Sequence, residues 1–253
     1  MLADIQVRGE DAAAELPPYD REVLARELAL MPEWFLGKHL ALELSAADSR
    51  MIAAAFEFLI AEALAQPSVF VHRDYHSRNL MVIDDRVPGG PTVGARMPGA
   101  PDGSARNPGV LDFQDALRGP IGYDLVSLLK DCYISWPRER VVGWVSGYRT
   151  LLRSQGGARG RRLAGGDDAE FLRWFDLIGV QRHIKVLGIF SRLWYRDGKA
   201  GYLNDLPLTL DYVRDACARY AELGGLARLL EQRVVPELPR ANARVAADAR
   251  GKS

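Results

Sequence analysis

Residues 71–80 read Val-His-Arg-Asp-Tyr-His-Ser-Arg-Asn-Leu, and residues 111–115 read Leu-Asp-Phe-Gln-Asp. Three short apolar runs border these polar stretches and predict β-strands at residues 69–71, 80–83 and 110–113. Much of the remaining chain has apolar residues at helical spacing, as in 46–65 and 168–197. The sequence therefore predicts an α+β protein that is mostly α-helical, with a few short strands around one polar loop.

The order and spacing of the polar side chains point to a chemistry. Asp74 is followed five residues later by Asn79, and Asp112 comes 33 residues after Asn79. An Asp and an Asn at this spacing between two strands are typical of the catalytic loop of kinase-like phosphotransferases. There a loop carboxylate accepts the proton of the attacking hydroxyl. An amide oxygen and a second carboxylate are the hard oxygen ligands that Mg²⁺ prefers.

The pattern His-x-Asp-x-His-x-x-Asn resembles the aminoglycoside phosphotransferase/choline kinase superfamily. Three segments, VHRDYHSRNLMV, GVLDFQDAxxGPIxYDLVSLLKD and YRDGKxGYLNDLP, are similar to one branch of it, the bacterial anomeric kinases for N-acetylmuramate and N-acetylglucosamine. The resemblance covers roughly residues 15–235. At Arg73 the sequence departs from the Gly that is common in the antibiotic phosphotransferases and matches the sugar-kinase branch.

The resemblance implies the C-terminal lobe of a protein-kinase-like phosphotransferase over residues 1–240. It implies ATP and Mg²⁺ as cofactors, and transfer to the anomeric hydroxyl of a sugar in cell-wall recycling. Asp74 corresponds to the catalytic base, and Asn79 and Asp112 to the metal ligands. A Gly/Pro-rich insertion is expected at residues 87–108 and a disordered tail at 241–253.

Four further polar residues are expected to support the loop. His72 and His76 are expected to brace it through hydrogen bonds rather than take part in the chemistry. Asp115 is interpreted as a support of its turn, with contact to metal or water as the alternative. Asp124 precedes a helix and is interpreted first as its N-terminal cap, with a role in the site as the alternative.

Positive side chains form one narrow stripe on the predicted helix 168–197, namely Arg182, Lys185, Arg192 and Arg196. Such a stripe could be a solvated face. Our hypothesis is that part of it faces the active site and attracts an anionic acceptor, such as the lactyl carboxylate of N-acetylmuramate. Between Asp168 and Arg233 there are nine acidic and ten basic residues. This balance disfavours a polycationic aminoglycoside.

One expected part of a kinase is not found in the sequence. Before His72 there are only two glycines, Gly9 and Gly37, and the only lysine is Lys38. No glycine-rich phosphate loop and no strand lysine for the ATP phosphates can be identified. We therefore expect the chain to be a fragment or a product of a mis-assigned start that lacks the N-terminal lobe, binds ATP weakly and transfers phosphate poorly.

Composition limits the partners. Lys+Arg and Asp+Glu both number 33, so the formal net charge is zero, which disfavours a nucleic-acid partner. The longest apolar stretch is interrupted by Glu57 and Glu62, so no membrane partner is expected. The two cysteines, Cys132 and Cys217, stand far apart, which fits a reducing cytoplasm. The expected partner is a small-molecule sugar.

Three alternatives remain at this point. The first is a phosphotransferase for an aminoglycoside or another small molecule. The second is a non-catalytic remnant of a kinase lobe, or a binding module. The third is a metallohydrolase that uses His72, Asp74 and His76, whose alternate spacing on an extended segment could place three ligands on one side.

Overall fold

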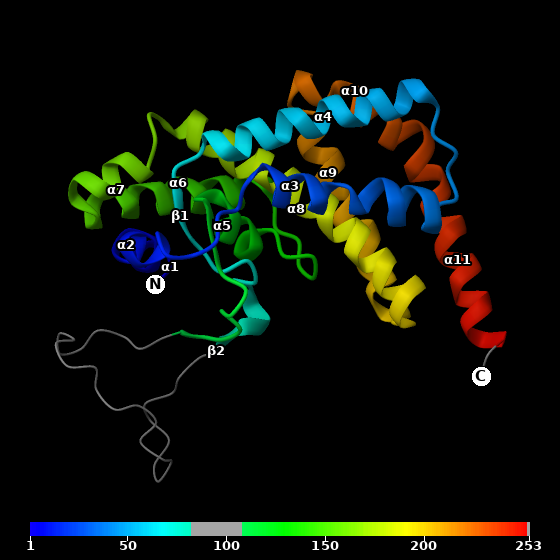
Figure 1. Ribbon diagram of the computed structural model, residues 1–253, viewed down its shortest axis with the longest axis horizontal. Coiled ribbons are helices and arrows are strands. Elements are labelled where there is room, and N and C mark those ends of the chain that lie inside the picture. The colour runs from blue at the N-terminus through cyan, green and yellow to red at the C-terminus, as the bar shows by residue number, and fades with distance from the viewer. Residues whose placement is uncertain (82–107, 252–253) are drawn as a thin grey trace, which may run out of the picture.

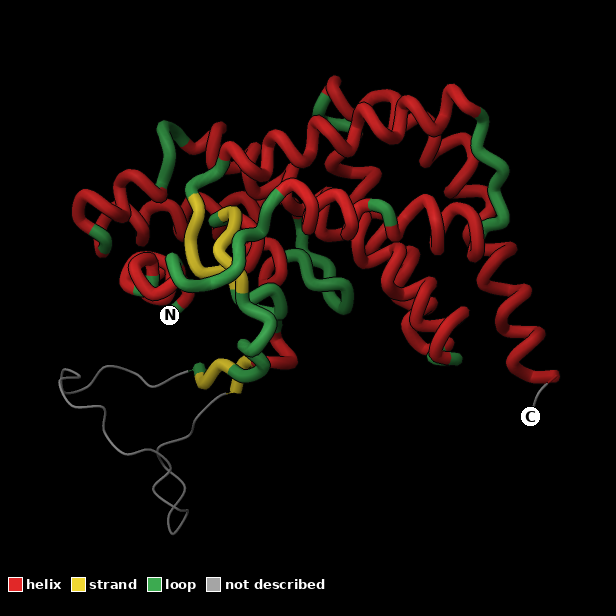
Figure 2. Tube along the Cα trace, in the orientation of Figure 1, coloured by secondary structure: helices red, strands yellow, loops and turns green. Residues whose placement is uncertain are grey.

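The computed structural model describes residues 1–81 and 108–251. Helices dominate it, and its strands form two small antiparallel pairs, so the predicted mostly helical α+β class is confirmed (Figure 2). The α-helices are α1 (Leu2–Arg8), α2 (Glu10–Ala13), α3 (Arg21–Leu28), α4 (Ala46–Ala65), α5 (Gly122–Leu129), α6 (Arg138–Gln155), α7 (Gly157–Leu163), α8 (Asp168–Asp197), α9 (Leu206–Cys217), α10 (Gly224–Leu229) and α11 (Val235–Gly251). Shorter or wider turns of helix are η1 (Met31–His39), η2 (Ser77–Asn79), η3 (Ala200–Asp205), η4 (Ala221–Leu223) and η5 (Leu230–Val234).

The ends of the two longest helices follow from local side-chain chemistry. Ser45 and Asp48 form a capping box at the start of α4, in which each side chain accepts the other's backbone N–H. Asp167 caps α8 by accepting the backbone N–H of Glu170, and Gly198 ends that helix in the left-handed conformation, with φ 70°. The sequence predicted both boundaries of α8.

Helix α8 lies at the centre of the helical body and packs against α4, α5, α9 and η1 (Figure 1). Most of its middle turns are buried, as expected for a helix surrounded by others. The helix approaches the start of η1 closely at Gly188, where a Cβ atom would lie 2.4 Å from the carbonyl carbon of Leu30. Glycine at this position lets α8 and η1 meet without a clash.

Two strand pairs frame the polar loop. β1 (Ser68–Val71) pairs with β4 (Leu117–Pro120), with Ser68 opposite Pro120 and Val71 opposite Leu117. β2 (Leu80–Met81) pairs with β3 (Gly109–Val110). Since β1 leads into the loop and β2 leads out of it, residues 72–79 are held at both ends.

The strand prediction for residues 110–113 was only partly right. β3 ends at Val110 because Asp112 adopts φ 67°, a left-handed conformation that cannot continue a strand. β4 was not predicted, since its sequence Leu-Arg-Gly-Pro has little β propensity and owes its conformation to pairing with β1. Residues 82–83 of the second predicted strand lie outside the described part of the chain.

The predictions of a disordered tail and of an insertion can be compared with the structure only where it describes those residues. Residues 241–251 belong to α11 rather than to a disordered tail, because Ala241 and Val245 lie one turn apart and are both buried. Residues 87–107 of the expected insertion lie outside the described residues, as do 252–253. No helix in the described ranges is long and apolar enough to cross a membrane.

Candidate active site

The polar loop and helix α8 enclose a small pocket that Asp74 faces. The pocket has a volume of about 150 Å³ and is lined by the loop, by residues that follow α5 and by the middle of α8. Its charged and polar lining includes Arg73, Asp74, His76, Asp131, Arg182 and Lys185. No residue of the described ranges forms a hydrogen bond to the Asp74 carboxylate. That carboxylate is thus available to a ligand.

The buried carboxylate of Asp124 fixes the start of the loop. It accepts hydrogen bonds from the backbone N–H of His72 at 2.7 Å and of Arg73 at 3.0 Å. Burial raises the pKa of Asp124 to about 7, although the two N–H donors oppose this rise. Asp124 is not the N-terminal cap of α5, because that position is Ile121 and has no side-chain cap. The side chain points to the loop instead.

Arg73, immediately before Asp74, has a conformation that glycine adopts most easily. Its φ is 76°, which strains most residues that have a Cβ atom. The Arg73 guanidinium forms an ion pair with Glu27 at 2.8 Å. An arginine can therefore take the place of the glycine that is common here in antibiotic phosphotransferases, with its side chain anchored on α3.

Glu27 is a site residue that the sequence reasoning missed. Its buried carboxylate pairs with Arg73 and with Lys185 of α8 at 2.7 Å, and it accepts hydrogen bonds from Gln181 at 3.1 Å and from Tyr19. Burial alone would raise the pKa of Glu27, but Lys185, Tyr19 and Arg73 outweigh it and the pKa lies below its usual value. Glu27 lies far from the motif in sequence, and no local pattern marks it.

The segments that carry the three residues predicted for base and metal ligands are joined by hydrogen bonds where β2 pairs with β3. The Asn79 side-chain N–H donates to the backbone carbonyl of Asp74 at 3.0 Å, which leaves its amide oxygen available. The backbone N–H of Leu111, next to Asp112, donates to the carbonyl of Asn79 at 3.0 Å. Burial lowers the pKa of His72, and the nearby carboxylates of Asp74 and Asp112 oppose this shift.

The donor set fits Mg²⁺. Asn79 and Asp112 would present an amide oxygen and a carboxylate, and Mg²⁺ is usually bound through one or two protein oxygens, waters and substrate phosphates. The exposed Asp112 carboxylate is held by Gln114, which donates to it at 2.7 Å. The described ranges contain no cluster of three or more His, Cys, Asp or Glu side chains that could hold a metal ion. His72, Asp74 and His76 all belong to the described ranges and do not form such a group.

The expected bracing of the loop by His72 and His76 stays a prediction, and the Leu111 backbone beside His72 opposes the lowering of its pKa as a hydrogen-bond partner would. Both ring nitrogens of His72, and Nδ1 of His76, are buried without a hydrogen-bond partner in the part of the chain that the structure describes. His72 packs edge-on against the ring of Tyr75, with 6.0 Å between ring centroids. Asp115 is exposed in the turn between β3 and β4.

Only part of the positive stripe on α8 lines the pocket. Arg182 and Lys185 line the pocket, whereas Arg192 and Arg196 are not among its lining residues, and Arg196 pairs with its neighbour Asp197. Lys185 is neutralised by Glu27. Arg182 is buried, donates to the Ser127 hydroxyl at 2.7 Å, and has no carboxylate within ion-pair distance among the described residues.

Comparisons with known proteins show which family the chain resembles. A model of the phosphotransferase enzyme family matches residues 2–89. The N-acetylmuramate/N-acetylglucosamine kinase of Neisseria meningitidis serogroup B is 45% identical over 222 residues, 88% of this chain and 59% of that protein. The chain resembles phosphotransferases in both comparisons. The resemblance predicted from the loop motif is thereby confirmed.

Two further relatives carry the same name. The N-acetylmuramate/N-acetylglucosamine kinase of Pseudomonas aeruginosa is 43% identical over 87% of this chain and 57% of that protein. The corresponding kinase of Pseudomonas putida is 42% identical over the same shares of the two chains. The chain thus spans between 57% and 59% of the length of these three relatives.

Proposed function

We propose that the protein is, or forms part of, an ATP-dependent phosphotransferase that acts on the anomeric hydroxyl of N-acetylmuramate or N-acetylglucosamine. The observation that carries the proposal is the loop of residues 72–79, where Asp74 faces a pocket and Asn79 is hydrogen-bonded to the Asp74 backbone. The names of the relatives support the choice of sugar.

Asp74 is the catalytic base in this proposal. Its carboxylate accepts the proton of the anomeric hydroxyl while that oxygen forms a bond to the γ-phosphorus of ATP. The bond between that phosphorus and the β–γ bridging oxygen breaks, and ADP leaves with the bond's electron pair. The absence of competing hydrogen bonds within the described ranges leaves the Asp74 carboxylate free for this proton.

Asn79 and Asp112 would hold Mg²⁺. When bound, the ion neutralises negative charge on the phosphate oxygens. The protein's own contribution is to fix these two ligands beside the base, through the hydrogen bond from Asn79 to the Asp74 carbonyl and the bond from Leu111 to the Asn79 carbonyl.

Arg182 and Lys185 give the pocket positive charge for the acceptor. Since Lys185 is already paired with Glu27, Arg182 is the cation left to attract the lactyl carboxylate of N-acetylmuramate. We expect Arg192 and Arg196 to contribute little, because they lie outside the pocket lining.

The 253 residues contain no glycine-rich phosphate loop. We therefore expect the chain by itself to bind ATP weakly and to transfer phosphate poorly. We place the reaction in the cytoplasm, where ATP is available and thiols stay reduced, and in the recycling of cell-wall sugars. The zero net charge supports a small-molecule partner rather than nucleic acid.

The test is a phosphorylation assay with a chimera. The chain is joined to the part of the meningococcal relative that the match leaves uncovered, and products are followed by phosphorus NMR with Mg²⁺ and ATP. N-acetylmuramate, N-acetylglucosamine and an aminoglycoside are compared as acceptors. We expect a sugar 1-phosphate from the first two and faster turnover than by the chain alone. Phosphorylation of the aminoglycoside alone would reject the proposed acceptor.

A further inference from the structure

Four acidic side chains are buried in the described ranges, and they differ in how well their charge is compensated. They are Glu27, Asp124, Asp131 and Asp176. A buried carboxylate is costly unless it is paired or hydrogen-bonded, so each should have close partners. Three of these four carboxylates have such partners.

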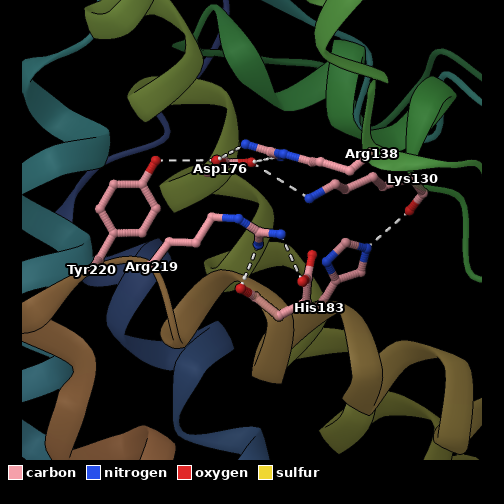
Figure 3. Close-up of polar contacts among 7 residues, drawn as sticks. Lys130, Arg138, Asp176, His183, Arg219 and Tyr220 are labelled. Carbon is pink, nitrogen blue, oxygen red and sulfur yellow. Dashed lines mark hydrogen bonds and ion pairs between the residues drawn. The ribbon is translucent and has the colours of Figure 1, made fainter. Parts of the chain in front are cut away.

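Glu27 pairs with two cations and Asp124 accepts two backbone N–H groups, as described above. Asp176 accepts both guanidinium N–H groups of Arg138 at 2.6 Å, together with contacts from Lys130 at 3.5 Å and the Tyr220 hydroxyl at 3.1 Å (Figure 3). These three carboxylates are therefore structural.

Asp131 is the exception. It is 2% exposed, and its one hydrogen bond from a described residue is a long one, from the Ser77 hydroxyl at 3.5 Å. No cation of the described ranges lies within ion-pair distance of it. An ionised carboxylate can accept about four hydrogen bonds. Asp131 thus keeps most of its capacity as an acceptor unused while it lines the same pocket as Asp74.

The backbone around Asp131 is held in place, so the position of its side chain in the pocket is defined. The preceding residue, Lys130, is fixed twice by α8: its carbonyl is hydrogen-bonded to the His183 ring at 2.9 Å, and its ammonium contacts Asp176 (Figure 3). The carbonyl of Asp131 accepts the backbone N–H of Ile134 at 3.3 Å. The carboxylate is therefore presented to the pocket in advance of any ligand.

The charge near Asp131 indicates the kind of ligand. Burial opposes the charged form of Arg182. Even so, the pKa of Arg182 lies above its usual value, and Asp131 is among the groups that raise it. The charges of Asp131 and Arg182 therefore act on each other, although no hydrogen bond joins them. With a cation already nearby, uncharged hydrogen-bond donors of a ligand complete the Asp131 site better than a second cation does.

We propose that Asp131 binds the acceptor sugar, its carboxylate accepting hydrogen bonds from hydroxyl or acetamido N–H groups of N-acetylmuramate or N-acetylglucosamine. The proposal rests on the function proposed above and adds a specificity residue to it. A site that hydrogen-bonds a sugar in this way rejects an analogue without the donor, because the buried carboxylate is then left unpaired.

The test measures binding rather than turnover, with the 253-residue chain. Isothermal titration gives the dissociation constant of each sugar for the wild type, for Asp131→Asn and for Asp211→Asn, an exposed carboxylate on α9 that serves as the control. We expect Asp131→Asn to weaken binding about tenfold or more, because charge-assisted hydrogen bonds are lost, and Asp211→Asn to leave it unchanged. Thermal unfolding is measured alongside.

Stability separates a binding role from a structural one. Since Asp131 is poorly compensated, we expect Asp131→Asn to unfold at the same temperature as the wild type or higher. Unfolding or marked destabilisation of this variant would overturn the proposal, and so would an unchanged dissociation constant in a chain that binds the sugar. If the wild type binds neither sugar, the proposed function fails, and the role of Asp131 fails with it.

Discussion

The carboxylate of Asp124 lies 2.7 Å from the backbone nitrogen of His72, two residues before Asp74. A second hydrogen bond, of 3.0 Å, runs from the backbone nitrogen of Arg73 to the other oxygen of the same carboxylate. Helix α5 is thereby tied to the loop 52 residues earlier in the chain. Because the carboxylate is fully buried, its protonation and the position of the loop are linked.

This link predicts a pH dependence of stability. The pKa of Asp124 is raised to about 7, mainly by burial, whereas in the unfolded chain it is about 4. The stabilisation from binding this proton is complete below about pH 4 and is lost as the pH rises through about 7. We expect the free energy of unfolding of the wild type to fall relative to Asp124→Asn across this range, by at most about 1.4 kcal/mol per pH unit.

Urea denaturation of both proteins at several values between about pH 4 and about pH 8 provides the measurement. Other titrating groups are common to the two proteins, so they cancel in the difference. Parallel stability curves over this range would show that Asp124 titrates as an ordinary carboxyl and that the loop is not linked to its protonation.

Glu27→Gln tests the buried ion pairs behind the loop. The substitution keeps the shape of the side chain but leaves the charges of Arg73 and Lys185 without their carboxylate. We expect a loss of about 3–5 kcal/mol in the free energy of unfolding, as for other broken buried pairs. Glu57→Gln is the control, since its pair with Arg21 is exposed and should contribute less than about 1 kcal/mol. Equal effects of the two substitutions would contradict the role assigned to Glu27.

Gly188→Ala tests the close packing of α8 on η1. The added methyl group would lie 2.4 Å from the carbonyl carbon of Leu30, so the helices must separate, and we expect destabilisation of about 1–3 kcal/mol. Gly143→Ala in α6 is the matched control, because a Cβ there meets nothing within 4 Å. It should stabilise the protein by roughly 0.5–1 kcal/mol through helix propensity. Thermal or chemical unfolding that ranks the two variants in the opposite order would refute this packing.

The sequence predicted those parts of the structure that depend on neighbouring residues. The apolar spacing predicted the helices at 46–65 and 168–197, and both end at local signals, namely the capping box of Ser45 and Asp48, the cap at Asp167 and the left-handed Gly198. Strand β4 and helix α7 were missed. β4 forms by pairing with a distant strand, and α7 has a Gly/Arg-rich sequence that predicts a loop.

In the candidate site, too, residues of a local motif could be predicted and residues brought in by tertiary packing could not. The spacing of Asp74, Asn79 and Asp112 was readable because the three belong to one motif. Glu27 and Asp131 were not, since a buried acid looks the same in sequence as an exposed one until the helices around it are placed. The stripe on α8 was correctly read as a helical face, but which of its residues reach the pocket depends on where the loop meets α8.

The most direct test of the central claim is the rate of sugar phosphorylation by the chimera with and without Asp74→Asn, with Asp211→Asn as the control. The amide keeps the size of the side chain but cannot accept the proton of the sugar hydroxyl. We predict that Asp74→Asn lowers the rate by about 100-fold to 10,000-fold with N-acetylmuramate binding unchanged, and that Asp211→Asn has no effect. A rate for Asp74→Asn within a few-fold of the wild type would contradict the account.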